Sequence, residues 1–169
     1  MSDLVLQKDV GALVVSKAMS RALSFTSGGG SDNASYTGIS IDRFAAFQNM
    51  PRALDIDIAY DATIGSGSTL SFTVVVQDSA DNSTWADYAT ESGATVVATG
   101  PSGGGNVQGV KRFTPYDPNR PTGSAGISIN GARRYVRTVF KPALSRGATD
   151  TAVCQAIGVF AGFDTLPGA

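Results

Sequence analysis

The fold is decided by the stretch Thr69-Leu70-Ser71-Phe72-Thr73-Val74-Val75-Val76-Gln77 (residues 69–77). Large apolar residues recur there at every second position, and β-branched residues are frequent. Successive side chains of a strand point to opposite faces, so this period of two predicts a strand with one buried face. The expected inward residues are Leu70, Phe72, Val74 and Val76. Sheet structure is therefore expected at the centre of the chain.

Similar runs lie on both sides of this strand. In residues 53–60, Leu54, Ile56, Ile58 and Tyr60 alternate with polar positions that include Asp55 and Asp57. Further short strands are expected at 36–41, 84–89, 95–99, 107–113, 127–129, 135–141 and 152–163, with Gly, Pro, Asn, Asp and Ser between them. The series predicts an all-β domain, an antiparallel β-sandwich arranged as a jelly roll. An immunoglobulin-like sandwich is the alternative.

The chain has 169 residues, a one-domain length. We expect a sandwich over 31–169, preceded by an N-terminal segment, 1–30, whose pattern leaves helix, strand and flexible arm open. Long flexible loops are expected at 100–106, which is rich in glycine, and at 114–124, where three prolines cannot donate to a ladder. In the connection 42–51, Phe44 and Phe47 are expected to be aromatic anchors.

Charge and hydropathy exclude several classes of protein. Thirteen Lys and Arg face fourteen Asp and Glu, a net charge of -1, whereas a nucleic-acid binder needs a basic footprint. Charged residues make up only 16%, against about 25% in an average domain. The sequence has no apolar run of about 18 residues, so no membrane span is expected. The N-terminus lacks the basic and apolar regions of a secretory signal.

The residues needed for catalysis are scarce. The sequence has no histidine, the commonest general base, and a single cysteine, which excludes an intrachain disulfide and a thiolate zinc site. Cys154 lies in an apolar run and is interpreted as a small core residue. Asp55 and Asp57, about 6.6 Å apart on one strand face, could form a glycosidase pair or a calcium site, but a solvated face is the favoured interpretation. We therefore expect no enzyme, no cofactor and no catalytic or metal-binding residue.

Residues 79–85 share features with the Asp box of sialidases, but the segment is one residue short and has no glycine. We interpret it as a hairpin turn formed by Asp81 and Asn82, with Trp85 buried on the return strand.

The remaining polar residues of note are candidate interface residues, although a solvated sheet face is the favoured interpretation of the cations among them. Arg133, Arg137 and Lys141 share one strand face, and Arg134 falls on the other face with Val136, Thr138 and Phe140. The three cations form either a solvated face opposite Asp55 and Asp57 or a surface for an acidic partner. The proline-rich loop adds the candidates Tyr116, Pro118 and Arg120. Tyr88 and Tyr116 are the candidate aromatic platform of a carbohydrate-binding module.

Three segments carry a family resemblance: residues 70–79, residues 81–88, and Arg134-Tyr135-Val136-Arg137. Over roughly residues 35–163 the chain resembles the jelly-roll cement or decoration proteins of tailed-phage capsids. The resemblance implies a virion structural protein that is made in the host cytoplasm and binds the major capsid protein on the outside of the head. It also implies a homo-oligomer, a dimer or trimer, with no direct contact to nucleic acid or membrane. The alternative is a head-spike or tail-associated module that binds carbohydrate or a receptor.

Overall fold

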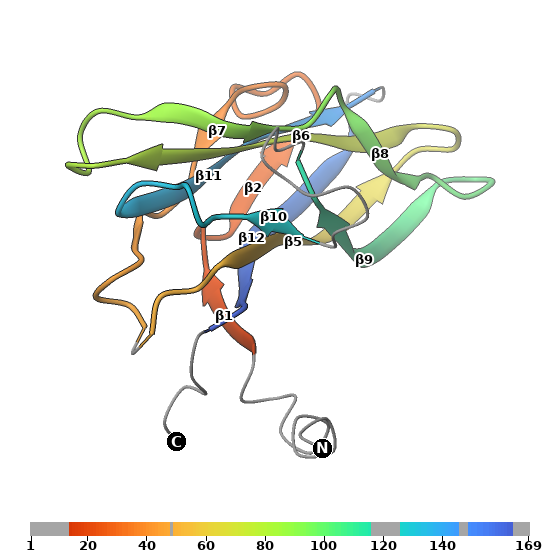
Figure 1. Cartoon of the computed structure of the whole chain (residues 1–169). Helices are drawn as coiled ribbons and strands as arrows, with labels where there is room; N and C mark the ends of the chain where they lie inside the picture. Colours follow the sequence, from red (N-terminus) through yellow and green to blue (C-terminus); the bar gives the residue numbers. More distant parts are fainter. Residues whose placement is uncertain (1–13, 48, 116–125, 146–148, 164–169) are drawn as a thin grey trace, which may run out of the picture.

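The computed structural model describes residues 14–47, 49–115, 126–145 and 149–163. These residues form twelve strands and no helix, arranged as two antiparallel sheets packed face to face (Figure 1). The predicted all-β sandwich is confirmed. No described segment is a helix long and apolar enough to cross a membrane.

Each sheet contains six strands but is only four strands wide, because two shorter strands pair with the same long neighbour at each edge. The first sheet comprises β1 (Val14–Ala18), β2 (Leu23–Thr26), β5 (Ala53–Ile64), β9 (Gly105–Phe113), β10 (Ile127–Ser128) and β12 (Thr151–Ala161). The second comprises β3 (Tyr36–Thr37), β4 (Ile41–Asp42), β6 (Thr69–Ser79), β7 (Ala86–Thr90), β8 (Thr95–Thr99) and β11 (Tyr135–Leu144). β12 and β5 are central in the first sheet, as β11 and β6 are in the second.

The strand order is that of a jelly roll. β1–β2, β3–β4, β7–β8 and β9–β10 each act as one interrupted strand, because both halves pair with the same neighbour. The first of the resulting strands then pairs with the last, the second with the seventh, the third with the sixth and the fourth with the fifth. A long antiparallel hairpin folded over on itself gives this pairing, which confirms the jelly-roll arrangement.

The core lies between the sheets and follows the alternation read from the sequence. Leu70, Phe72, Val74 and Val76 have no exposed surface. The ring of Phe72 lies edge-on to those of Phe113 of the first sheet and Phe140 of its own. Cys154 is a buried core residue, as expected, and burial raises the pKa of its thiol to about 12.

The sequence pattern left helix, strand and flexible arm open for residues 14–26. These residues contain β1 and β2, which both pair with β12. Between them the backbone N–H groups of Met19 and Ser20 both donate to the Ala156 carbonyl, at 2.9 and 3.1 Å. Both side chains are fully buried there. Two consecutive residues therefore bond to one carbonyl of β12, and this bulge breaks the alternation of inward and outward side chains. For this reason the sequence pattern of residues 14–26 was ambiguous. Residues 1–13 lie outside the described residues.

Two glycine-rich segments are more ordered than their composition predicts. In the 27–33 loop, Asp32 accepts hydrogen bonds from the backbone N–H groups of Gly28 and Leu144, at 2.8 and 2.9 Å. Of the expected 100–106 loop, Gly105 and Asn106 already belong to β9. In the proline-rich loop, residues 116–125 lie outside the described residues.

Candidate interface surfaces

The three predicted interface cations do not form one continuous stripe. Arg137 and Lys141 lie on the outer face of β11, as the alternation predicted, but Arg133 precedes the strand. Its backbone N–H donates to Asp78 Oδ2 at 2.8 Å, and its Nε lies 3.8 Å from Asp78 Oδ1. Arg133 is therefore tied to the end of the second sheet, although half of its side chain stays exposed.

Arg137 is covered by an aromatic ring. Its guanidinium carbon lies 4.0 Å from the Trp85 ring centroid, and its Nε donates to Gln77 Oε1 at 2.9 Å. Gln77 in turn donates to Asp87 at 2.7 Å. Burial lowers the pKa of Arg137. Trp85 lies against this outer-face guanidinium and is only partly buried, so the expectation of a buried ring is wrong.

The expected pairing of this face with Asp55 and Asp57 is also wrong, because β5 lies in the other sheet. Arg112 of β9 holds both carboxylates: its Nε and one Nη lie 2.9 and 3.1 Å from Asp57, and the other Nη lies 3.6 Å from Asp55. The hydrogen bond to Asp57 raises the pKa of Arg112. The two aspartates are cross-strand ion-pair partners on a sheet face.

Arg134 does not point inward with Val136, Thr138 and Phe140. It lies before β11, is half exposed, and donates to Asp42 through Nε and Nη at 3.0 and 2.7 Å. The alternation of faces did not predict the direction of Arg134, because the alternation applies only within the strand and β11 begins one residue later.

The 79–85 segment is a hairpin turn, as predicted. Asp81 Oδ1 accepts hydrogen bonds from the backbone N–H groups of Ser83 and Thr84, at 2.9 and 2.8 Å. Asn82 has a φ of 61°, the left-handed conformation that asparagine tolerates. At the tip, the Ser40 hydroxyl donates to Asn82 Oδ1 at 2.5 Å, which links the turn to the β3–β4 connection.

Asp81→Asn is expected to destabilise the protein at neutral pH. Hydrogen bonds from Thr84 and Ser83 hold the Asp81 pKa well below its ordinary value of about 3.9. A depressed folded-state pKa contributes stability above the unfolded-state pKa, and this contribution is lost as the pH falls towards the folded-state value. The difference in free energy of unfolding between wild type and variant should therefore shrink below about pH 4. Urea unfolding across this range measures it. The control is Asp61→Asn at an exposed position, and a difference independent of pH would contradict the prediction.

Sequence reasoning missed the most deeply buried charge of the described residues. Arg43 is 1% exposed, although it follows the short strand β4 in a polar connection. Its guanidinium donates to the carbonyls of Ala132, Arg133 and Pro51. Burial lowers the pKa of Arg43. The residue thus joins three chain segments at one end of the sandwich.

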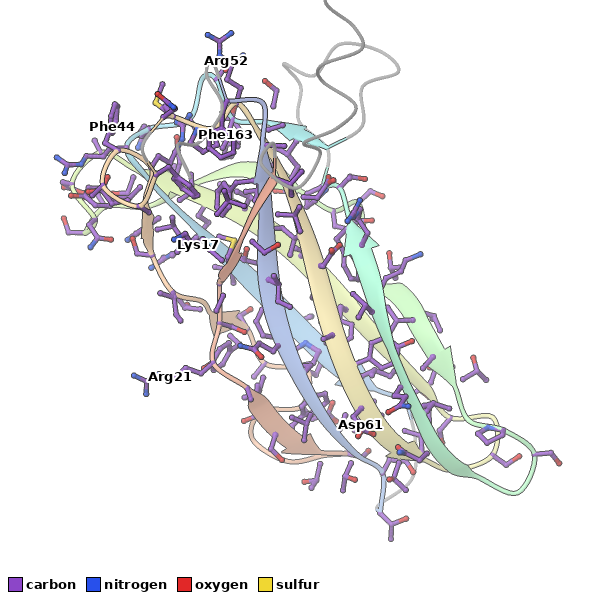
Figure 2. The ribbon with its side chains drawn as sticks, turned by 90° about the horizontal axis from the view of Figure 1, so that it is seen from below. Lys17, Arg21, Phe44, Arg52, Asp61 and Phe163 are labelled. Atoms are coloured by element: carbon purple, nitrogen blue, oxygen red, sulfur yellow. The ribbon has the colours of Figure 1, made fainter. Side chains whose placement is uncertain are left out.

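The next residue, Phe44, points outward and is 60% exposed. Asp42 Oδ1 accepts the N–H groups of Phe44 and Ala45 at 3.0 and 3.3 Å, while Arg134 holds the same carboxylate. The loop backbone is therefore fixed on both sides of Phe44, which Figure 2 shows at the margin of the molecule. Two aromatic anchors were expected here, but only Phe47 packs inward, with its ring centroid 4.7 Å from that of Phe160.

A shallow pocket of about 250 Å³ lies on the outer face of the first sheet. It is lined by Ala22, Ala59, Tyr60, Asp61, Val153, Cys154 and Gln155. Ala59 stands in register with Gln155 of β12 and Val110 of β9, so the smallest side chain of this row creates the depression. Within the described ranges, no group of three or more potential ligand side chains is placed to hold a metal ion.

The remaining predicted residues do not form an aromatic platform in the described structure. Tyr88 packs against the core, and its hydroxyl donates to the Ser128 carbonyl at 2.7 Å. Tyr88, one of the two candidates for that platform, is therefore only partly exposed. Tyr116, Pro118 and Arg120 lie outside the described residues.

Comparison with known proteins gives similarity only at the level of structure. No family model matches the chain, and no curated protein matches it. A structure of the infectious bursal disease virus Gx strain is similar at a TM-score of 0.44 and 12% identity, covering 92% of this chain and 33% of that one. The VP2 subviral particle of the same virus is similar at a TM-score of 0.39 and 14% identity, covering 92% of this chain and 34% of that one. A Bacillus endospore appendage pilus protein is similar at a TM-score of 0.30 and 11% identity, with 90% of each chain covered. The chain thus spans about a third of the two viral chains that it resembles.

Proposed function

We propose that the protein is a virion structural protein, without enzymatic activity, that decorates the outside of a tailed-phage head and stabilises it by binding the major capsid protein. The resemblance of residues 35–163 to cement proteins supports this proposal. The observation that carries it is the outer face of the second sheet, where Trp85 and Arg137 are stacked and held by Gln77. Tryptophan and arginine are enriched among the residues that dominate binding at interfaces.

The geometry fits repeated docking on a shell. Side chains fixed before binding lose little conformational entropy when a partner arrives. Lys141 extends the same strand face and has no ion pair among the described residues, so it is available to an acidic group of the shell protein. Many copies on one head convert modest individual affinities into strong attachment.

Binding to heads that lack the protein tests the proposal. We expect the purified chain to sediment with such heads and to raise the temperature at which they release DNA. Combined alanine substitution of Arg133, Arg137 and Lys141 should weaken binding about tenfold or more and reduce its salt dependence. Lys111→Ala, an exposed cation on the first sheet, is the matched control. Absence of wild-type protein from the head fraction would refute the function, whereas unchanged binding of the triple variant would refute only this surface.

A further inference from the structure

We propose that Asn130 is a modification site, at which the side-chain amide reacts with the backbone nitrogen of Gly131 and is converted by water, through a cyclic imide, into isoaspartate. The product adds one atom to the main chain of the turn that anchors Arg43, and it thereby lowers the stability of the fold. The inference concerns the chain itself and does not depend on the proposed head-binding function.

The reacting residues lie at the surface, in the connection between the two sheets. Asn130 and Gly131 are the two central residues of the turn that leads from β10 in the first sheet to β11 in the second. The N–H of Ala132 donates to the Ile129 carbonyl at 3.2 Å and closes this turn. Both central residues are exposed. Water therefore reaches the reacting atoms without any opening of the sandwich.

The backbone nitrogen of Gly131 is available as the nucleophile. Among the described residues, neither its N–H nor the side-chain amide of Asn130 makes a hydrogen bond. Gly131 has no side chain to shield the nitrogen, and a Cβ placed there would meet only the Tyr88 hydroxyl within 4 Å, at 3.6 Å. Because glycine is conformationally permissive, the backbone can rotate as ring closure requires.

Asn130 is singled out among the asparagines of the chain, because only Asn130 is followed by a glycine. Asn82 is the best-placed alternative, since it also lies in an exposed turn. There, however, the N–H of Ser83 donates to Asp81 Oδ1 at 2.9 Å, and Asn82 Oδ1 accepts a hydrogen bond from Ser40. Both groups that would have to react are held, so we expect Asn82 to stay unmodified while Asn130 reacts.

The reaction needs water as its only co-reactant. The Gly131 nitrogen attacks Cγ of Asn130, so an N–Cγ bond forms and the Cγ–Nδ2 bond breaks. Ammonia leaves with the proton of the attacking N–H, and a cyclic imide remains. Water then opens the ring. Cleavage of the original peptide bond gives isoaspartate, in which the main chain runs through Cβ and Cγ, whereas cleavage of the new bond gives ordinary aspartate.

The turn cannot take up a further main-chain atom without losing a contact. On the side of the first sheet, the N–H of Ile129 donates to the Arg52 carbonyl at 2.9 Å. On the side of the second sheet, the carbonyls of Ala132 and Arg133 accept the guanidinium of Arg43. The chain is thus held on both sides of the reacting bond, and isoaspartate must displace one of these anchors. The loss of one hydrogen bond lowers the melting temperature of a protein of this size by about 2–4 °C.

Ageing of the full-length protein at mildly alkaline pH tests the proposal, because the attacking nitrogen must lose its proton. Samples are digested at intervals, the peptides are weighed, and isoaspartate is identified by methylation with an isoaspartyl methyltransferase. Gly131→Ala is the matched variant. The φ of Gly131 lies outside the left-handed region and the added Cβ meets no atom closer than 3.6 Å, so this variant should fold normally. Asn130→Asp supplies the new charge without the additional main-chain atom.

In the wild type, isoaspartate should accumulate at Asn130 while Asn82 keeps its amide. Gly131→Ala should slow the conversion about tenfold, which corresponds to about 1.4 kcal/mol of added barrier. Aged wild type should melt about 2–4 °C below fresh protein, whereas aged Gly131→Ala and fresh Asn130→Asp should not. Conversion of Asn82 as fast as that of Asn130 would overturn the assignment of the site. An unchanged melting temperature after full conversion, or an equal loss in Asn130→Asp, would overturn the argument from the main chain.

Discussion

Arg43→Ala is expected to lower the free energy of unfolding by about 3–5 kcal/mol. The substitution removes the hydrogen-bond donor of the buried Pro51 carbonyl and of the partly buried carbonyls of Ala132 and Arg133. A buried carbonyl left unsatisfied costs about 1–3 kcal/mol. It also leaves a cavity where the largest fully buried side chain of the described residues now lies. Chemical denaturation at neutral pH measures the change.

Arg43→Lys is expected to recover little of this loss, because one ammonium group cannot reproduce the planar fork that reaches three carbonyls. The matched control is Arg21→Ala, since Arg21 is exposed and projects away from the sheets in Figure 2. Its substitution should change stability very little. Equal stabilities of Arg43→Ala and Arg21→Ala would show that the buried guanidinium contributes nothing.

Gly38→Ala is expected to destabilise the protein by about 3 kcal/mol. Gly38 lies between β3 and β4, where a Cβ would collide with the backbone carbonyl oxygens of Met19 and Thr138. The N–H groups of Gly38 and Ile39 donate to these oxygens at 2.8 and 2.6 Å, so the backbones cannot separate without losing hydrogen bonds. A methyl group there forces apart the edges of the two sheets.

Gly30→Ala is the control for this substitution, because a Cβ at Gly30 meets no atom within 4 Å. Its stability should stay within about 0.5 kcal/mol of the wild type. Thermal and urea unfolding of both variants are compared. A Gly38→Ala protein as stable as Gly30→Ala would mean that the sheet edges move apart freely.

The fold was predictable because its main signal is local. The alternation in 53–60 and 69–77 assigns each residue to a face without knowledge of its neighbours, and these strands became the central β5 and β6. The edge strands were harder. Residues 14–26 carry an insertion at Met19 and Ser20 that interrupts the alternation, and only hydrogen bonding to β12 shows that they are strands.

The candidate surfaces were less predictable because they depend on which segments meet. The sequence places Asp55, Asp57 and Arg137 on outer faces, but only the strand order shows that the aspartates meet Arg112 instead. Similarly, nothing local distinguishes Phe44 from Phe47. Their opposite directions follow from Arg43, whose carbonyl partners come from residues 51, 132 and 133.

The position of β12 has a consequence for the route of folding. This last strand lies at the centre of the first sheet and pairs with β5 along its whole length while also holding β1 and β2. The first sheet therefore remains split while the ribosome has not yet released residues 151–161. Partners so distant in sequence carry a large loop-closure cost, and folds of this kind reach the native state slowly, in milliseconds to seconds. Until β12 is available, the backbone edge of β5 that pairs with it stays unpaired, and an unpaired strand edge is a template for aggregation.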